Sequence, residues 1–205
     1  MPPQSTSWQQ SLKAFLHPRV ETMFFYGFSA GIPLLLIFSS LSLWLREAGV
    51  DRSTVTYFSW AALAYSFKFL WAPLIDRLPI PGLTRWLGRR RAWLLVAQAT
   101  VAISVFSISL VDPTQPGALN LMAFAVVMLG FTAATQDIVI DAYRIESAGA
   151  ELQALMSSSY IAGYRIGMLT SGAGSLVLAS WLGSTSESYS YAAWQSTYAI
   201  MAVTM

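Results

Sequence analysis

The sequence predicts an all-α integral membrane protein made of six hydrophobic helices, the last of them incomplete. Hydrophobic residues make up 55% of the 205 residues and charged residues only 11%, against roughly 25% charged in ordinary soluble domains. Apolar stretches of about 20 residues recur, which is the length that crosses a hydrocarbon core of about 30 Å. Arginine and lysine gather in alternate loops, as they do in membrane proteins of fixed orientation.

The six apolar stretches follow one another with short polar turns between them. Residues 1–20 form a polar segment without the pattern of a cleaved signal, and residues 21–205 form the transmembrane bundle. The spans are predicted at 23–45, 54–75, 92–111, 118–142, 155–181 and 192–205. The loop from Asp112 to Gly117 holds two prolines and a glycine, which end helices. The sixth stretch is too short for a full crossing, so we expect the sequence to stop inside a helix.

The basic residues indicate which ends of the helices face the cytoplasm, because cytoplasmic loops hold the excess of lysine and arginine. Lys13, Arg19, Arg144 and the arginines between the second and third spans fall on one side, while Arg46 and Arg52 fall on the other. We therefore expect a cytoplasmic N-terminus. Five tryptophans lie near predicted span ends, where we expect them to be interfacial: Trp44, Trp71, Trp93, Trp181 and Trp194.

Four charged residues fall inside the predicted spans: Lys68, Asp137, Asp141 and Arg165. Each costs about 2.5 to 3.5 kcal/mol at the bilayer centre, so the four must be paired or hydrated. At 1.5 Å per residue, Lys68, Asp137 and Arg165 are predicted in the inner half of the membrane, at comparable depths. The charges therefore form either a polar cluster between helices or the floor of an aqueous cavity.

Small residues beside the charges favour the cavity. One face of the second span carries small residues that lead to a charge: Tyr57, Ala61, Ala64 and Lys68. Two simpler alternatives stay open. The long stem of Lys68 reaches toward the membrane interface, or Asp141 pairs with Arg144 at the membrane surface, since the two are three residues apart on a helix.

Other residues of the spans carry weaker signals. Gly27 with Gly31, and Gly163 with Gly167, have the spacing that lets two membrane helices pack closely. Two aromatic residues of the second span, Trp60 and Tyr65, are candidates for stacking on a sugar ring, the alternative being ordinary packing.

Catalysis and metal chemistry find no support in the sequence. There is no cysteine, and the single histidine, His17, precedes a proline outside the spans. Asp137 and Asp141 lie on one helix, whereas an intramembrane aspartyl protease needs two carboxylates that face each other. We therefore expect a protein that is not an enzyme, with no cofactor, no metal and no nucleic-acid partner.

Several motifs resemble the AmpG-type muropeptide permeases of the major facilitator superfamily. They are GIPLLL at 31–36, WLREAGV at 44–50, KFLWAPLIDR at 68–77, GRRR at 88–91 and QDIVIDAYRIE at 136–146. These motifs are spread over the first four spans and their loops. The resemblance covers essentially the whole chain, more weakly in the last two spans.

The resemblance implies two six-helix bundles around a central cavity in a bacterial inner membrane, of which this chain is the N-terminal bundle. The implied cargo is anhydromuropeptide, a sugar linked to a short acidic peptide, imported with protons for peptidoglycan recycling and so linked to β-lactamase induction. The implied partners are this substrate, protons, the lipid bilayer and the C-terminal six-helix half. Two alternatives remain: a carrier of another acidic solute such as acetyl-CoA, or a non-transporting membrane helper domain.

The resemblance also implies a gating loop between the second and third spans, formed by Asp76, Arg77, Arg89, Arg90 and Arg91. In the superfamily this signature loop stabilises the outward-open state through cytoplasmic contacts. Residues 78–87 separate its two halves here, whereas the usual loop is compact.

The cargo and the buried charges together suggest roles for the site residues. A peptide that bears carboxylates needs cations in the cavity, and Lys68 and Arg165 are the candidates for substrate binding. A proton-coupled carrier needs a carboxylate whose protonation changes with access. Asp137 is the first candidate for this proton-coupling role and Asp141 the second.

Overall fold

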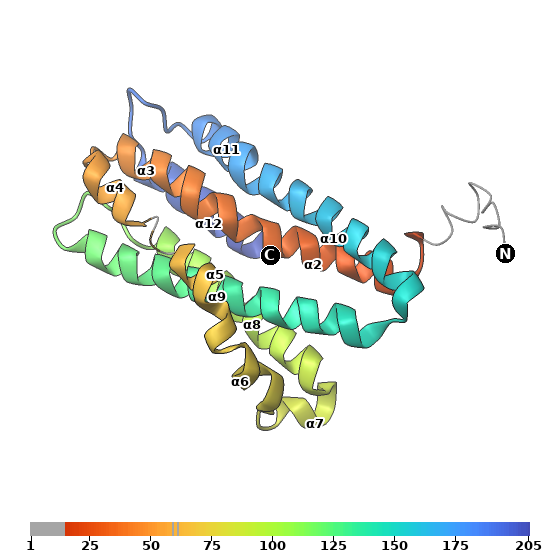
Figure 1. Cartoon of the computed structure of the whole chain (residues 1–205). Coiled ribbons are helices and arrows are strands. Elements are labelled where there is room, and N and C mark those ends of the chain that lie inside the picture. Colours follow the sequence, from red (N-terminus) through yellow and green to blue (C-terminus); the bar gives the residue numbers. More distant parts are fainter. Residues whose placement is uncertain (1–14, 59, 61) are drawn as a thin grey trace.

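The computed structural model describes residues 15–58, 60 and 62–205, and these form a bundle of helices (Figure 1). Most of the predicted segment 1–20, Lys13 included, lies outside the described residues, as do Ala61 and the side chain of Tyr57. The described ranges contain no strand, only an isolated antiparallel bridge between Thr185 and Ser188. The predicted all-α class is therefore confirmed.

The helices follow the chain in a simple order, with π-turns inside two long helices and a 3₁₀ turn between two short ones. The elements are α2 (Pro18–Leu35), π-turn η1 (Leu36–Ser40), α3 (Leu41–Glu47), α4 (Arg52–Phe58), α5 (Ala62–Phe67), 3₁₀ turn η3 (Lys68–Leu70), α6 (Ala72–Arg77), α7 (Leu83–Leu87), α8 (Arg89–Ser109), α9 (Ala118–Ser147), α10 (Ala150–Leu169), π-turn η4 (Thr170–Gly174), α11 (Ser175–Trp181) and α12 (Tyr191–Thr204).

Within the described residues, three helices are long and apolar enough to cross a membrane: Pro18–Glu47, Arg89–Ser109 and Ala118–Ser147. They overlap the first, third and fourth predicted spans. α10, η4 and α11 make a further continuous helix over residues 150–181, whose apolar character is lowered by Arg165 and by small polar residues. α12 covers 14 residues. Membrane crossing by these last two helices stays a prediction.

The predicted second span, 54–75, is not one regular helix. The chain makes the 3₁₀ turn η3 between α5 and α6. Pro73 lies in the first turn of α6, and proline lacks the N–H that continues a helix and clashes with the preceding turn. The tighter 3₁₀ geometry is common at such connections. Lys68 consequently begins a bend instead of lying in a straight helix.

An aromatic cluster closes the core where α3 ends. Trp44 stacks on Trp194 with ring centroids 5.7 Å apart, and Tyr198 packs against both rings. Glu47 accepts hydrogen bonds from Trp194 Nε1 at 2.7 Å and from Ser184 Oγ at 2.6 Å. Both tryptophans are fully buried inside the bundle, and their interfacial depth in the membrane stays a prediction. A buried indole N–H needs an acceptor, and here Glu47 supplies it for Trp194.

α2 and α10 run side by side (Figure 1) and approach so closely that their contact requires glycine. A Cβ atom on Gly27 would lie 2.1 Å from the carbonyl oxygen of Tyr160, and one on Gly31 would lie 2.3 Å from that of Tyr164. The two glycines of α10 face the backbone of α2 in the same way. The close packing predicted from the glycine spacing is therefore confirmed.

The same two helices are joined again at their π-turns, and α12 is joined to the first of these turns. Ser40 Oγ donates a hydrogen bond to the carbonyl oxygen of Ser171 at 2.9 Å, and the hydroxyl of Tyr198 donates to the carbonyl oxygen of Leu36 at 2.9 Å. A π-turn interrupts the regular helical hydrogen bonds, and backbone carbonyls without partners are costly inside a bundle. The side chains therefore stabilise the wider turns and hold the helices together.

We expect Gly27→Ala to destabilise the bundle by about 1 to 3 kcal/mol or more, the range for overpacking a close contact. The added methyl group would meet the backbone of Tyr160, which cannot yield unless α10 moves. Gly174→Ala is the matched control, because a Cβ atom there meets its nearest neighbour at an ordinary 3.8 Å. Thermal unfolding of the purified proteins in detergent measures the difference, and equal melting temperatures would contradict the close contact.

Candidate functional site

An open pocket of about 570 Å³ brings the four predicted intramembrane charges to one place. α2, η3, α9 and α10 contribute to its wall. Its polar lining consists of Lys68, Asp137, Asp141, Tyr160, Tyr164 and Arg165. The charges therefore meet around a cavity, although they come from segments up to about 100 residues apart in the sequence.

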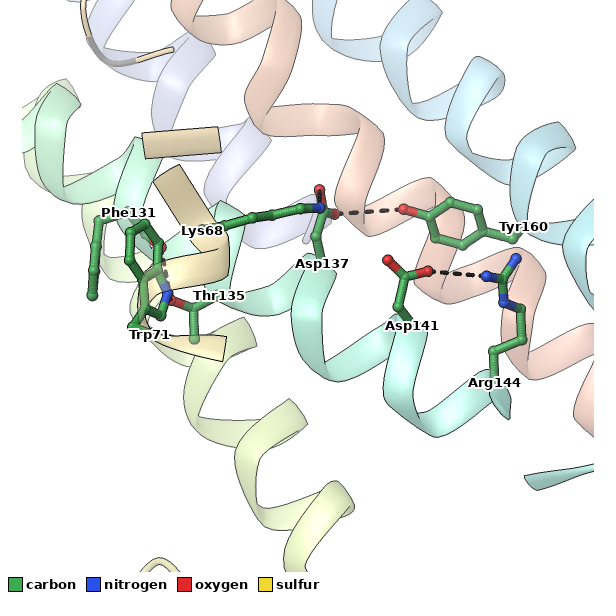
Figure 2. Close-up of polar contacts among 8 residues, drawn as sticks. All are labelled: Lys68, Trp71, Phe131, Thr135, Asp137, Asp141, Arg144 and Tyr160. Atoms are coloured by element: carbon green, nitrogen blue, oxygen red, sulfur yellow. Dashed lines mark hydrogen bonds and ion pairs between the residues drawn. The ribbon is translucent and has the colours of Figure 1, made fainter. Parts of the chain in front are cut away.

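Asp137 lies between a cation and a phenol (Figure 2). Its Oδ2 atom is 3.7 Å from Lys68 Nζ, and the hydroxyl of Tyr160 donates to its Oδ1 atom at 3.5 Å. The side chain of Asp137 is 19% exposed and that of Lys68 is 36% exposed. A carboxylate buried to this degree needs a nearby cation, and the ion pair with Lys68 provides it.

Trp71 fixes the bend that carries Lys68. Its indole Nε1 donates to Thr135 Oγ1 at 3.1 Å, and its ring packs on Phe131 with centroids 4.6 Å apart. Both partners belong to α9, the helix of Asp137 (Figure 2). Trp71 thus attaches the segment after η3 to α9 and brings Lys68 within reach of Asp137.

A buried polar link holds α9 on the other side, one residue before Asp137. Gln136 Nε2 donates to Gln98 Oε1 at 2.6 Å, and Ser29 Oγ donates to the same oxygen at 2.7 Å. These side chains come from α9, α8 and α2. Interhelical hydrogen bonds of this kind contribute to helix association in membranes, so the link helps to fix α9 beside the pocket.

Asp141 has a different partner from Asp137. Arg144 Nη2 lies 3.3 Å from Asp141 Oδ1, and Arg144 Nη1 donates to Ser157 Oγ at 2.8 Å. The Asp141 side chain is 54% exposed. The pairing of Asp141 with Arg144, one of the alternatives that the sequence leaves open, therefore occurs, while Asp141 also lines the pocket.

The remaining predicted substrate residues divide into two groups. Arg165 lines the pocket and forms no ion pair with any described residue, so its guanidinium is available to a ligand. Tyr65 is half-buried against the core, and Trp60 is 64% exposed. Neither aromatic residue belongs to the pocket lining, whose aromatic members are Tyr160 and Tyr164.

Sequence reasoning missed these two tyrosines. They lie four residues apart on α10, one of them directly before Arg165, so they share a helix face near a predicted site residue. A phenol hydroxyl inside a membrane helix usually needs a polar partner. That requirement is the signal by which they could have been found.

In the described part of the chain no three His, Cys, Asp or Glu residues are grouped as a metal site would need.

A second charged cluster joins α6, α8 and α9 within the predicted gating loop. Arg90 Nη1 lies 2.7 Å from Asp76 Oδ1, and its Nε and Nη2 atoms donate to the two carboxylate oxygens of Glu146 at 2.9 and 2.5 Å. Such two-pronged contacts are strong and directional. Through these contacts Arg90 joins α8 to α6 and to α9. Glu146 is a member of this cluster that sequence reasoning missed.

The other predicted members of the gating loop have no such contacts. Arg77, Arg89 and Arg91 form no ion pair with a described residue. The extra residues 78–87 hold the short helix α7, and Trp93 Nε1 donates to the carbonyl oxygen of Leu78 at 2.8 Å. The longer loop therefore still brings Asp76 to Arg90.

We expect Arg90→Lys to loosen this joint, because lysine keeps the charge but loses the two-pronged contact with Glu146. The partners are about half exposed, so the loss is about 1 kcal/mol, or roughly fivefold faster opening. Hydrogen exchange of the amides in α7 and the last turn of α9 measures the opening. Arg89→Lys is the control, and equal exchange in both variants would contradict the role of Arg90.

Comparison with known proteins places the chain in a family. The model of the family described as acetyl-coenzyme A transporter 1 matches residues 22–185. The putative transporter AmpG 4 of Rickettsia conorii is 38% identical over 191 residues, which cover 93% of this chain and 44% of that protein. The anhydromuropeptide permease of Escherichia coli K12 is 37% identical over 195 residues, which cover 94% of this chain and 36% of that protein.

The chain thus spans less than half the length of these relatives. An uncharacterized protein of Haemophilus influenzae is 39% identical over 156 residues, which cover 76% of this chain and 35% of that protein. The predicted resemblance to AmpG-type proteins is confirmed by the relatives of that name. Because the family model covers most of the sequence, the chain belongs to the acetyl-coenzyme A transporter 1 family of membrane transporters.

Proposed function

We propose that this chain is the N-terminal half of a carrier that imports anhydromuropeptides with protons across the bacterial inner membrane. In this proposal the uptake serves peptidoglycan recycling and influences β-lactamase induction. The observation that carries the proposal is the pocket in which the Lys68–Asp137 ion pair lies beside Arg165. The relative named anhydromuropeptide permease supports this choice of cargo.

The cations of the pocket match an acidic cargo. Arg165 has no ion-pair partner among the described residues, and a guanidinium recognises a carboxylate with two parallel hydrogen bonds. Lys68 has a partner in Asp137, at the long separation of 3.7 Å. A substrate carboxylate competes with Asp137 for this ammonium group. Arg165 thus binds the cargo, and the Lys68–Asp137 ion pair opens when the cargo binds.

This competition couples the binding of substrate to the protonation of Asp137. Once Lys68 turns to the substrate, the Asp137 carboxylate loses its counter-charge while it stays largely buried, and the neutral acid becomes the more favourable form. Asp137 then takes up a proton, and the charge of the pocket stays balanced. Release of substrate on the other side restores the ion pair and expels the proton. Asp141 is less suited to this role, since Arg144 pairs with it.

The basic end of the bundle faces the cytoplasm in this proposal. Arg77, Arg89, Arg90 and Arg91 then lie inside, following the excess of arginine in cytoplasmic loops. The C-terminal six-helix half supplies the opposite wall of the cavity and the partners of the gating loop. Alternating access arises from movement of one half against the other.

A second cargo is favoured by a specific observation. The matching family is described by an acetyl-coenzyme A transporter, and coenzyme A esters are also acidic, so the same cations fit them. Uptake of labelled anhydromuropeptide and of labelled acetyl-CoA, measured side by side, separates the two. A helper domain without transport would take up neither.

We expect Asp137→Asn to abolish accumulation of labelled anhydromuropeptide that is driven by a proton gradient. Amide side chains carry no titratable proton, so uptake falls to the level of vesicles without the carrier. The measurement uses inverted and right-side-out vesicles that contain the full-length carrier, with and without an imposed gradient. Asp51→Asn, at an exposed aspartate outside the pocket, is the matched control and keeps gradient-driven uptake. Normal uptake by Asp137→Asn at every pH would refute the proton role.

We expect Arg165→Gln to raise the substrate concentration for half-maximal uptake by about tenfold to a hundredfold, the value of a hydrogen bond to a charged group. Kinetics of uptake at a fixed proton gradient measure this change. The maximal rate changes less, because Arg165 binds cargo and does not carry the proton. An unchanged half-saturating concentration would remove Arg165 from the substrate site.

A further inference from the structure

Asp137 is held from two sides by different segments of the chain. Lys68 of η3 lies on the Oδ2 side, and Tyr160 of α10 donates to Oδ1 from the opposite side (Figure 2). The separations of 3.7 and 3.5 Å are at the long limit for an ion pair and a hydrogen bond. A small displacement of α10 is therefore enough to tighten the contact with Tyr160 or to break it.

The position of Tyr160 along the bundle is set by α2. Its carbonyl oxygen faces Gly27, where a Cβ atom would lie 2.1 Å away. The neighbouring Ser159 Oγ donates to the carbonyl oxygen of Val20 at 2.8 Å. Tyr160 is thus attached to α2 through its main chain while its side chain reaches toward α9.

The attachment has a sequence pattern that occurs twice. Both 24–31 and 160–167 read aromatic-x-x-Gly-aromatic-x-x-Gly. Each aromatic carbonyl oxygen of one segment faces a glycine of the other, with Cβ positions 2.0 to 2.3 Å away. This reciprocal packing leaves no room for α10 to slide along α2. The two helices therefore move as one unit, and Tyr160 moves with them.

We infer that Tyr160 is a positioning residue for Asp137, whose hydroxyl couples the carboxylate to the α2/α10 pair. The inference rests on the proposed function, in which Asp137 exchanges the coupled proton. While the contact is made, the phenol O–H stabilises the charged carboxylate beside Lys68. Hydrogen bonds from Arg144 to Ser157 and from Gln136 to Ser29 hold the α2/α10 pair on α9. When these bonds break during the change of access, the pair moves away and the charged form loses this donor. Movement of the helices is thereby translated into release or uptake of the proton.

Several other groups face Asp137 and must be separated from Tyr160. Lys68 lies on η3, Asp141 on the same helix as Asp137, and Tyr164 with Arg165 on α10. The charge of Asp137 also acts on Tyr65 of α5 and on Tyr164. Among the described residues, Tyr160 donates to Oδ1 and Tyr164 lines the same pocket without such a bond. Tyr164→Phe is therefore the matched control for Tyr160→Phe.

The test compares the pH dependence of uptake in vesicles that contain the full-length carrier. We expect Tyr160→Phe to raise the pH of half-maximal uptake by about half a unit or more, the effect of one lost hydrogen bond on a carboxylate. Tyr164→Phe leaves this pH unchanged. Equal pH profiles for the two variants would overturn the inference, whatever their maximal rates.

A second measurement does not depend on the cargo. Infrared difference spectra of the purified carrier, recorded over a pH titration, contain the C=O stretch of protonated Asp137, identified as the band that Asp137→Asn removes. We expect Tyr160→Phe to shift this band and its titration midpoint, and Tyr164→Phe to shift neither. A shifted band without anhydromuropeptide uptake would contradict the proposed cargo alone. A band that Tyr160→Phe leaves unchanged would refute the positioning role.

Discussion

The cost of a charged side chain in an apolar bundle determines the arrangement of the whole site. Asp137 and Asp141 lie in α9, a helix long and apolar enough to cross a membrane. A charge in such surroundings has to be paired or hydrated, and Lys68 and Arg165 face the same pocket. In the folded chain the four charged side chains line one shared pocket. The ion pair between Lys68 and Asp137 depends on two separate constraints, the bend that begins at Lys68 and the attachment of Trp71 to α9. The electrostatic requirement and the local backbone geometry are therefore satisfied together.

The glycine contact between α2 and α10 fixes the position of the pocket wall that α10 forms. Without side chains between them, the two backbones meet at distances that no larger residue permits. Small residues at such contacts are the usual means by which membrane helices associate, because lipid offers no hydrophobic drive. One consequence is that Tyr160 and Arg165 occupy fixed heights along the bundle. The glycines thus act on the site although they do not line it.

The positions of the long apolar helices and the meeting of the four charges could be predicted from the sequence. Both follow from local properties, the length of an apolar stretch and the cost of burying a charge. The partners could not be predicted in the same way. Glu146 belongs to a quoted motif, but its contact with Arg90 depends on how α8 and α9 pack. Trp44 lies near a helix end, as an interfacial tryptophan would, yet stacking on Trp194 buries it. Tertiary packing decides such cases, and a single sequence does not reveal it.

Contact lengths differ between the ends of the bundle and its pocket. The Arg90 contacts at the α7 end measure 2.5 to 2.9 Å, and the Glu47 contacts beside the aromatic cluster measure 2.6 and 2.7 Å. Those of Asp137 measure 3.5 and 3.7 Å. Short charged contacts fix helices to one another, whereas long ones are exchanged at little cost. The lengths thus separate the contacts that hold helices together from those of the pocket, where Lys68 exchanges Asp137 for a substrate carboxylate in the proposed function.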